Sequence, residues 1–327
     1  MKIGVIGNQA CDADSIVSAY VYAWFLNHAD PSNQYCAFVH CDLSELSSRL
    51  DFLEICKISN FSNFDFFSLS DSAQSMSSWI LMDHHLPNPP ISSSQVIEII
   101  DHHVPTTEKA RLLIQSVPRT DIRVIASTCT IVAERILKSS FHIPDHIKWM
   151  LMMVICTDTG NLSEVLATAT PTDIAVLNRL KADLNVSDLS GFFAQVRDSK
   201  FSPEFWNSVS VNRMLEYDFK DINGVGMSVI FRSLIGLDDS EILSFAKKQS
   251  YETFVVLSGA LTSDKSVQRE LMIYRSTGVG SIQARLESTF SLSLIAASSS
   301  VLKYLVLDGS FSRKKFAPKF LSILSDS

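Results

Sequence analysis

Residues 1–26, MKIGVIGNQACDADSIVSAYVYAWFL, decide the fold expected for this chain. Lys2–Gly7 is a short apolar run of the kind that forms a buried strand, and Ser15–Leu26 carries apolar residues at the spacing of one helix face. The acidic loop Asp12-Ala13-Asp14 lies between them. This stretch therefore predicts a strand, a polar turn and a helix, which together form the basic unit of an α/β domain.

The alternation of short apolar runs and helical patterns continues through the first half of the chain. It predicts strands at Gln34–His40, Trp79–Met82 and Val96–Ile100, and helices at Ala126–Leu137, His146–Cys156 and Thr170–Leu184. Strands that alternate with helices favour a largely parallel sheet. We therefore expect an α/β fold with a parallel-sheet domain at residues 1–186.

The pattern changes after residue 186. Ser187–Trp206 loses the periodicity and collects serine, Gly191 and Pro203, which indicates a linker at 187–206. Beyond it, the sequence predicts strands at Val225–Phe231, Phe254–Leu261 and Glu270–Tyr274, and helices at Asp238–Lys248 and Val279–Leu286. Residues 207–327 are therefore expected to form a smaller α+β domain.

Composition narrows the class of protein. Of the 327 residues, 46% are hydrophobic and 19% are charged, which is typical of a globular protein. The net charge of −7 argues against nucleic acid as a partner. The longest apolar run, Trp149–Cys156, is too short to span a bilayer, and the six cysteines form no C-x-x-C pair. We therefore expect a cytoplasmic protein with free thiols and no membrane segment, and the oligomeric state stays open.

Two Asp-His-His triplets carry the strongest chemical signal. Asp83–His85 and Asp101–His103 each follow an apolar run and precede a proline. Both are therefore expected at the carboxyl edge of the sheet, where open α/β folds bind ligands.

Further acidic residues add to these triplets. Asp12 and Asp14 follow the first strand, and Asp158 follows the helix predicted at His146–Cys156. Carboxylates combined with imidazoles suit Mn²⁺, Mg²⁺ or Co²⁺ better than a thiolate-preferring ion. For each residue taken singly, a simpler interpretation stays open: Asp12 or Asp14 could cap the first helix, and Asp158 could be a turn residue. Taken jointly, the repeated acidic groups favour a metal site.

Four motifs follow one another along the chain, at residues 7–19 (GNQACDADSIVSA), 81–85 (LMDHH), 98–103 (EIIDHH) and 156–162 (CTDTGNL). In this order they resemble the motifs of the DHH-superfamily phosphoesterases of the exopolyphosphatase/prune branch. Residues 126–136 (ASTCTIVAERI) resemble the family's helix between the third and fourth motifs. Residues 214–220 (MLEYDFK) and 312–315 (SRKK) resemble its second domain, called DHHA2. The resemblance spans nearly the whole chain.

This resemblance implies two divalent metal ions, Mn²⁺ or Mg²⁺, with Co²⁺ as a further candidate. The matching ligand positions are Asp12, Asp14, Asp83, His102 and Asp158, of which Asp83 and Asp158 would bridge both ions. His103 matches a position that contacts substrate phosphate and completes the implied catalytic set. Lys220, Arg313 and Lys314 match phosphate-binding positions of the DHHA2-like domain, and Asp101 would orient a neighbouring ligand.

One position separates this chain from a related family. Soluble family II pyrophosphatases carry histidine at the position of Asn8, whereas asparagine is normal in the exopolyphosphatase/prune branch. An amide oxygen binds transition metals more weakly than imidazole does, so Asn8 would at most be a weak ligand. Asn8 therefore argues against a dedicated pyrophosphatase.

The activity that the resemblance implies is that of an exopolyphosphatase. Two-metal hydrolysis would cleave the terminal phosphoanhydride of inorganic polyphosphate and release orthophosphate. The alternatives are an inorganic pyrophosphatase, a nucleotide phosphodiesterase, or a prune-like binding protein with weak catalysis. For the basic residues near Arg313, a solvated C-terminal tail is the alternative to a phosphate site.

Overall fold

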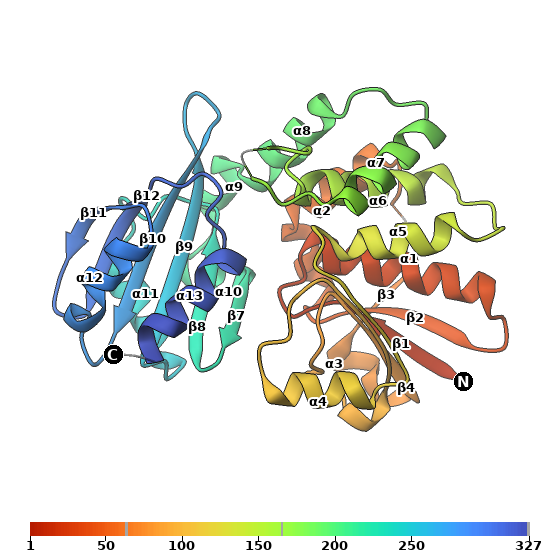
Figure 1. Cartoon of the computed structure of the whole chain (residues 1–327), viewed down its shortest axis with the longest axis horizontal. Helices are drawn as coiled ribbons and strands as arrows, with labels where there is room; N and C mark the ends of the chain where they lie inside the picture. Colours follow the sequence, from red (N-terminus) through yellow and green to blue (C-terminus); the bar gives the residue numbers. More distant parts are fainter. Residues whose placement is uncertain (63–64, 165, 326–327) are drawn as a thin grey trace. The chain divides into compact units, whose positions relative to one another are not determined.

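Two units make up the fold, Met1–Ser199 and Lys200–Ser327, and the computed structural model describes residues 1–62, 65–164 and 166–325 (Figure 1). The boundary between the units lies inside the segment 187–206. This segment is mostly helical, because α8 (Ser190–Lys200) and α9 (Pro203–Ser208) occupy it. Each helix fully buries only one side chain, Val196 or Trp206, so no apolar stripe marks it in the sequence.

The first unit is built on a six-stranded sheet in the order β3-β2-β1-β4-β5-β6, and all neighbouring strands are parallel. Its strands are β1 (Lys2–Ile6), β2 (Gln34–Val39), β3 (Phe66–Ser68), β4 (Ser78–Met82), β5 (Val96–Asp101) and β6 (Arg119–Ile122). The expected strands are all present, whereas β3 and β6 were not expected. β3 has only three residues and β6 reads Arg-Thr-Asp-Ile, so neither shows an apolar run.

Helices cover both faces of this sheet (Figure 1). They are α1 (Ala13–Ala29), α2 (Leu50–Ile58), α3 (Leu69–Ser72), α4 (Glu108–Ser116), α5 (Thr128–Leu137), α6 (Asp145–Asp158) and α7 (Pro171–Asp183), with 3₁₀ turns at Leu43–Ser48, Ala73–Ser75 and Ser93–Gln95. α1, α5 and α6 share one core, which includes the fully buried Val17, Val132 and Leu151. α3 and α4 cover the opposite face, over Phe38 and Trp79. The expected α/β class with a parallel sheet is confirmed.

The strand order of this sheet reverses at β1. Strands β2 and β3 lie on one side of β1, and β4, β5 and β6 lie on the other. Such a reversal opens a crevice at the carboxyl ends of the strands. Gly7 lets α1 begin close to the end of β1, because a Cβ on this residue would lie 2.6 Å from the carbonyl oxygen of Ser15. The loops after β1, β4 and β5 therefore converge on one place.

The second unit has a mixed six-stranded sheet in the order β11-β12-β10-β9-β8-β7. Its elements are α10 (Val211–Tyr217), β7 (Phe219–Ile222), β8 (Val225–Ile230), α11 (Asp239–Lys248), β9 (Thr253–Leu261), β10 (Val267–Arg275), α12 (Gly280–Thr289), β11 (Leu292–Ala297), β12 (Val301–Val306) and α13 (Arg313–Ser325). Only β8 and β9 pair in parallel. Helices α12 and α13 share one core with the sheet, and α10 and α11 share another. The expected smaller α+β domain is confirmed.

Two further expectations concern the chain as a whole. All six cysteines are free thiols, as expected. Within the described residues, no helix combines the length and the apolar character needed to cross a membrane.

Candidate metal centre

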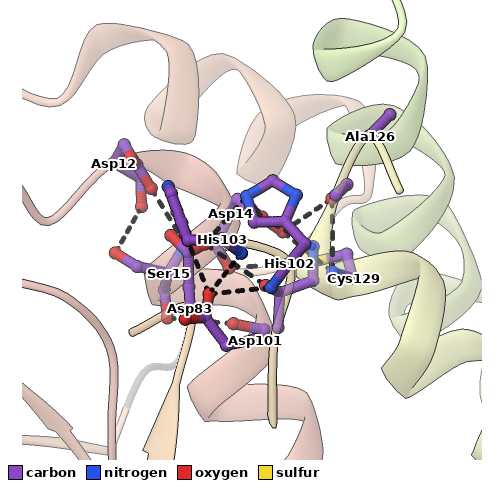
Figure 2. Close-up of polar contacts among 12 residues, drawn as sticks. Asp12, Asp14, Ser15, Asp83, Asp101, His102, His103, Ala126 and Cys129 are labelled. Atoms are coloured by element: carbon purple, nitrogen blue, oxygen red, sulfur yellow. Dashed lines mark hydrogen bonds and ion pairs between the residues drawn. The ribbon is translucent and has the colours of Figure 1, made fainter. Parts of the chain in front are cut away.

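The site lies where the carboxyl ends of the central strands meet (Figure 2). Asp12 caps the start of α1 after β1, Asp83 directly follows β4, and Asp101 is the last residue of β5. His102 and His103 follow Asp101 and turn toward Asp83. The structure therefore brings both Asp-His-His triplets and the first acidic loop together, as the strand pattern predicts.

Asp14 is a buried carboxylate held by the start of α5. Its oxygens accept hydrogen bonds from the Ser127 hydroxyl at 2.6 Å and from the backbone N–H groups of Thr128 and Cys129, both at 2.8 Å. The N-terminus of a helix favours such an anion. Burial and the nearby charge of Asp83 nevertheless raise the pKa of Asp14. The hydrogen bonds to Asp14 and the charge of His102 therefore do not fully offset the cost of burying this carboxylate beside Asp83.

Asp83 occupies a strained backbone position. Its φ of 62° lies in the left-handed region, which residues other than glycine adopt uncommonly. Its carboxylate accepts hydrogen bonds from Nδ2 of Asn8 at 2.5 Å and from the Thr128 hydroxyl at 3.2 Å. The side chain is only 2% exposed. The strained turn therefore directs a buried carboxylate into the site.

The orientation of His102 leaves one ring nitrogen for a ligand. Its Nδ1 lies 3.1 Å from the carbonyl oxygen of Ile125 and donates to it, which places the lone pair of the neutral ring on Nε2. This Nε2 lies 3.1 Å from Oδ1 of Asp83 and 3.8 Å from Oδ2 of Asp14. A nitrogen lone pair facing two carboxylates is repulsive unless a proton or a cation lies between them.

The carboxylate of Asp101 accepts hydrogen bonds from two histidines and does not face Nε2 of His102 as Asp83 and Asp14 do. Its Oδ1 accepts from Nδ1 of His103 at 2.8 Å, and its Oδ2 accepts from Nδ1 of His85 at 2.5 Å. Burial alone would raise the pKa of Asp101, but the hydrogen bonds from His103 and His85 outweigh it and hold this pKa well below the usual range. Asp101 is therefore a charged carboxylate that orients two imidazoles.

The donor set fits a divalent cation. Ligand atoms of Asp83, His102 and His103 all lie within 4.8 Å of one another. Carboxylate oxygens with imidazole nitrogens suit Mn²⁺, Mg²⁺ or Co²⁺. The nearby thiol of Cys129 is no competing ligand, because burial and the charges of Asp14, Asp158 and Asp83 raise its pKa well above the usual range.

Asp158 lies near this cluster. Its charge raises the pKa of the Cys129 thiol together with the charges of Asp14 and Asp83. Asp158 is the last residue of α6 and not a turn residue. Asp12 is the N-cap of α1, where its Oδ1 accepts from the Ser15 N–H at 3.0 Å. The capping interpretation thus holds for Asp12, and it does not hold for Asp14.

Asn8 is buried beside the carboxylates as a hydrogen-bond donor. Its Nδ2 donates to Asp83, and its Oδ1 accepts from the Ala10 N–H at 2.8 Å. In this orientation the amide nitrogen, and not the oxygen, faces Asp83. Its predicted role as a weak metal ligand stays a prediction.

Several supporting residues were not predicted from the sequence. Ser127 and Thr128 bind the carboxylates of Asp14 and Asp83, although they lie far from both in sequence. The fully buried Asp173 fixes their loop by accepting from the Ala126 N–H at 3.1 Å. The signal in the sequence was the Ser-Thr pair before a helix, which is typical of an N-cap but does not identify a partner.

The predicted phosphate-binding cations belong to the second unit. Lys220 lies on β7, and Arg313 and Lys314 begin α13. Arg313 is largely buried and bonds to Asp218, directly before β7. Arg313 is therefore part of a folded cluster and not of a solvated tail.

Known proteins share these features. Residues 2–157 match the DHH family, N-terminal domain. The chain is 27% identical over 351 residues to exopolyphosphatase PRUNE1 of Rattus norvegicus and 26% identical over 357 residues to that of Homo sapiens. Each alignment covers 98% of the chain and 75% of the relative. With 19% identity and a TM-score of 0.68, the fold also matches a crystal structure assigned as a family II inorganic pyrophosphatase of Methanococcus jannaschii, over 99% of the chain and 100% of that structure. Residues 2–157 therefore form a DHH-family N-terminal domain, and the chain as a whole is similar to the exopolyphosphatase/prune branch of that superfamily.

Proposed function

We propose that the chain is an exopolyphosphatase, a metal-dependent hydrolase that releases orthophosphate from the end of inorganic polyphosphate. The observation that carries this proposal is the convergence of Nε2 of His102 with the buried carboxylates of Asp83 and Asp14. Relatives named as exopolyphosphatases align with 98% of the chain, which supports the substrate class.

The proposal assigns a role to each group of side chains. Divalent ions held by Asp12, Asp14, Asp83, His102 and Asp158 would activate water and stabilise the charge of the phosphoryl oxygens. Nδ1 of His103 donates to Asp101, which orients the ring and leaves Nε2 as the atom proposed to contact a phosphate oxygen. Lys220, Arg313 and Lys314 are the proposed contacts to the phosphate chain.

Two readouts on the full chain test this proposal: release of orthophosphate from the phosphate chains and release of mononucleotide from a dinucleotide. Long-chain polyphosphate, tripolyphosphate, pyrophosphate and a dinucleotide are compared with Mg²⁺, Mn²⁺ and Co²⁺ in turn. We expect kcat/KM for the polyphosphates to exceed that for the other two substrates by at least about tenfold, or about 1.4 kcal/mol. Preference for pyrophosphate would instead establish a pyrophosphatase, and cleavage of the dinucleotide alone would establish a phosphodiesterase. Binding of polyphosphate without turnover under any metal would establish a binding protein.

A further inference from the structure

Asp218 joins two distant parts of the second unit. Nη1 of Arg313 donates to the carbonyl oxygen of Asp218 at 2.8 Å, and Nη2 donates to its Oδ1 at 2.7 Å. The two residues are 95 positions apart in sequence, and their side chains are only 12% and 18% exposed. The start of α13 is therefore fixed to the residue that precedes β7.

Asp218 also lies among further cations. Burial alone would raise its pKa, but the charges of Arg313, Lys220 and Lys200 outweigh burial and lower it. The ammonium group of Lys200 lies 5.2 Å from the ring centre of Phe231, a contact that restrains it at the end of α8. The charges of three cations thus act on one carboxylate, and the four groups together carry a formal charge of about +2.

We propose that Asp218 is a positioning residue for the phosphate chain and that Lys200 is a further cation of the same site. This proposal rests on the proposed function. A guanidinium has five N–H donors, so the two that bind Asp218 leave three for phosphate oxygens. Because Asp218 already fixes the plane of the Arg313 guanidinium, less conformational entropy is lost when a phosphate binds.

Charge alone and positioning predict opposite effects for the same substitution. Asp218→Ala removes a negative charge from a site for an anion, so charge alone predicts a lower KM for tripolyphosphate. Loss of positioning predicts a fall in kcat/KM of roughly ten- to a hundredfold, the value of a hydrogen bond to a charged group. Asp218→Asn keeps an oxygen that can accept from Arg313, and we expect it to recover part of that loss.

Asp221→Asn is the matched control for the charge change. Asp221 is an exposed residue of β7 that accepts from the Tyr251 hydroxyl at 2.7 Å. We expect its kcat/KM to stay within about twofold of the wild type, because an exposed charge is screened by solvent. Lys200→Ala should raise KM, and a wild-type KM would remove Lys200 from the proposal.

A double-mutant cycle shows whether Asp218 acts through Arg313. In an Arg313→Ala background, Asp218→Ala should lower kcat/KM by no more than about a further twofold, because the guanidinium that Asp218 positions is already absent. Full additivity of the two losses would overturn the positioning role. Arg313→Lys keeps the positive charge but not the planar, bidentate guanidinium. Its kcat/KM should fall nearly as much as that of Arg313→Ala. This variant decides the question if Asp218→Ala fails to fold, and wild-type kcat/KM in it would contradict the proposal.

A binding measurement separates this proposal from the proposed function. Calorimetric titration of the full chain with tripolyphosphate in EDTA measures the affinity of the cation cluster for the phosphate chain in the absence of turnover. If the wild type binds and Asp218→Ala binds at least tenfold more weakly, positioning holds even where no phosphate chain is hydrolysed. Equal or tighter binding by Asp218→Ala would overturn positioning, whatever the substrate of the enzyme proves to be.

Discussion

Nε2 of His102 lies 3.1 Å from Oδ1 of Asp83, although neither atom carries a hydrogen when the ring is neutral and the acid is ionised. The cause is the backbone, because the carbonyl oxygen of Ile125 holds the ring proton on Nδ1. The chain thus maintains an arrangement that a cation stabilises. Backbone contacts that select the tautomer of a metal-binding histidine are a common device of metalloproteins.

Divalent metal should stabilise the fold more strongly as the pH rises. Burial and the charge of Asp83 raise the pKa of Asp14 above that of an unfolded aspartate, which is about 4. Without metal, Asp14 therefore lowers the free energy of unfolding as the pH rises above about 4. A bound cation removes that penalty. We expect Mn²⁺ to raise Tm more at about pH 7.5 than at about pH 5.5, and about 2.7 kcal/mol of stabilisation at a hundred times Kd. Thermal melts with Mn²⁺ or EDTA at equal ionic strength measure this, and an equal shift at both pH values would contradict it.

Asp158→Ala should abolish turnover while the fold is retained. The resemblance implies that Asp158 is a ligand of both ions, and the charge of Asp158 acts on Cys129 together with the charges of Asp14 and Asp83. We expect activity below about a tenth of the wild type, equivalent to at least about 1.4 kcal/mol of barrier. Asp145→Ala is the matched control, since Asp145 begins the same helix and its side chain is 73% exposed. A larger residual activity in Asp158→Ala, or an equal loss in the control, would show that Asp158 is not a ligand.

The apolar and polar pattern of the sequence predicted the features that depend on neighbouring residues, namely the main strands and the loops that follow them. The run Lys2–Gly7 forms β1, and the triplet Asp83–His85 directly follows β4, because apolar runs bounded by turns form strands. The strand order was not predictable in this way, because it depends on which edges pair across long separations. β6 escaped notice because its ion pairs involve Arg119 and Asp121, which make it polar in sequence.

The contacts that complete the site depend on tertiary structure. The Ser127 hydroxyl reaches Asp14 across 113 residues, and Asn8 reaches Asp83 across 75. A sequence shows that such residues can donate hydrogen bonds, but it does not show to which acceptor. The residue types at the candidate site were therefore predictable, whereas the hydrogen bonds that orient them were not.

Asn8→His should change which metal activates the enzyme. At present the amide donates to Asp83 through Nδ2, whereas an imidazole offers a nitrogen lone pair that Mn²⁺ and Co²⁺ bind better than Mg²⁺. We expect the ratio of activity with Mn²⁺ or Co²⁺ to that with Mg²⁺ to rise, and pyrophosphate hydrolysis to rise relative to polyphosphate. Steady-state rates with each metal and substrate measure both ratios. An unchanged metal profile would mean that position 8 lies outside the reach of the ions.

Asp101→Asn should weaken both catalysis and the fold, in a pH-dependent way. Four donors converge on this buried carboxylate: the backbone N–H groups of His102 and His103 and the Nδ1 atoms of His103 and His85. An amide cannot accept from all of them, so we expect kcat to fall roughly ten- to a hundredfold, as is typical when a group that orients metal-site residues is lost.

The stability of Asp101→Asn gives the pH test of this arrangement. The folded pKa of Asp101 lies well below its unfolded value, so its stabilisation is complete above about pH 4 and is lost as pH falls through the folded pKa. In EDTA the variant should therefore lose about 1.5–3 kcal/mol at pH 7, the range for hydrogen bonds to a charged group, and less near pH 3. Urea denaturation at both pH values measures the two differences. Equal losses at both would mean that Asp101 acts through its shape and not through its charge, and wild-type kcat would mean that the two imidazoles need no such anchor.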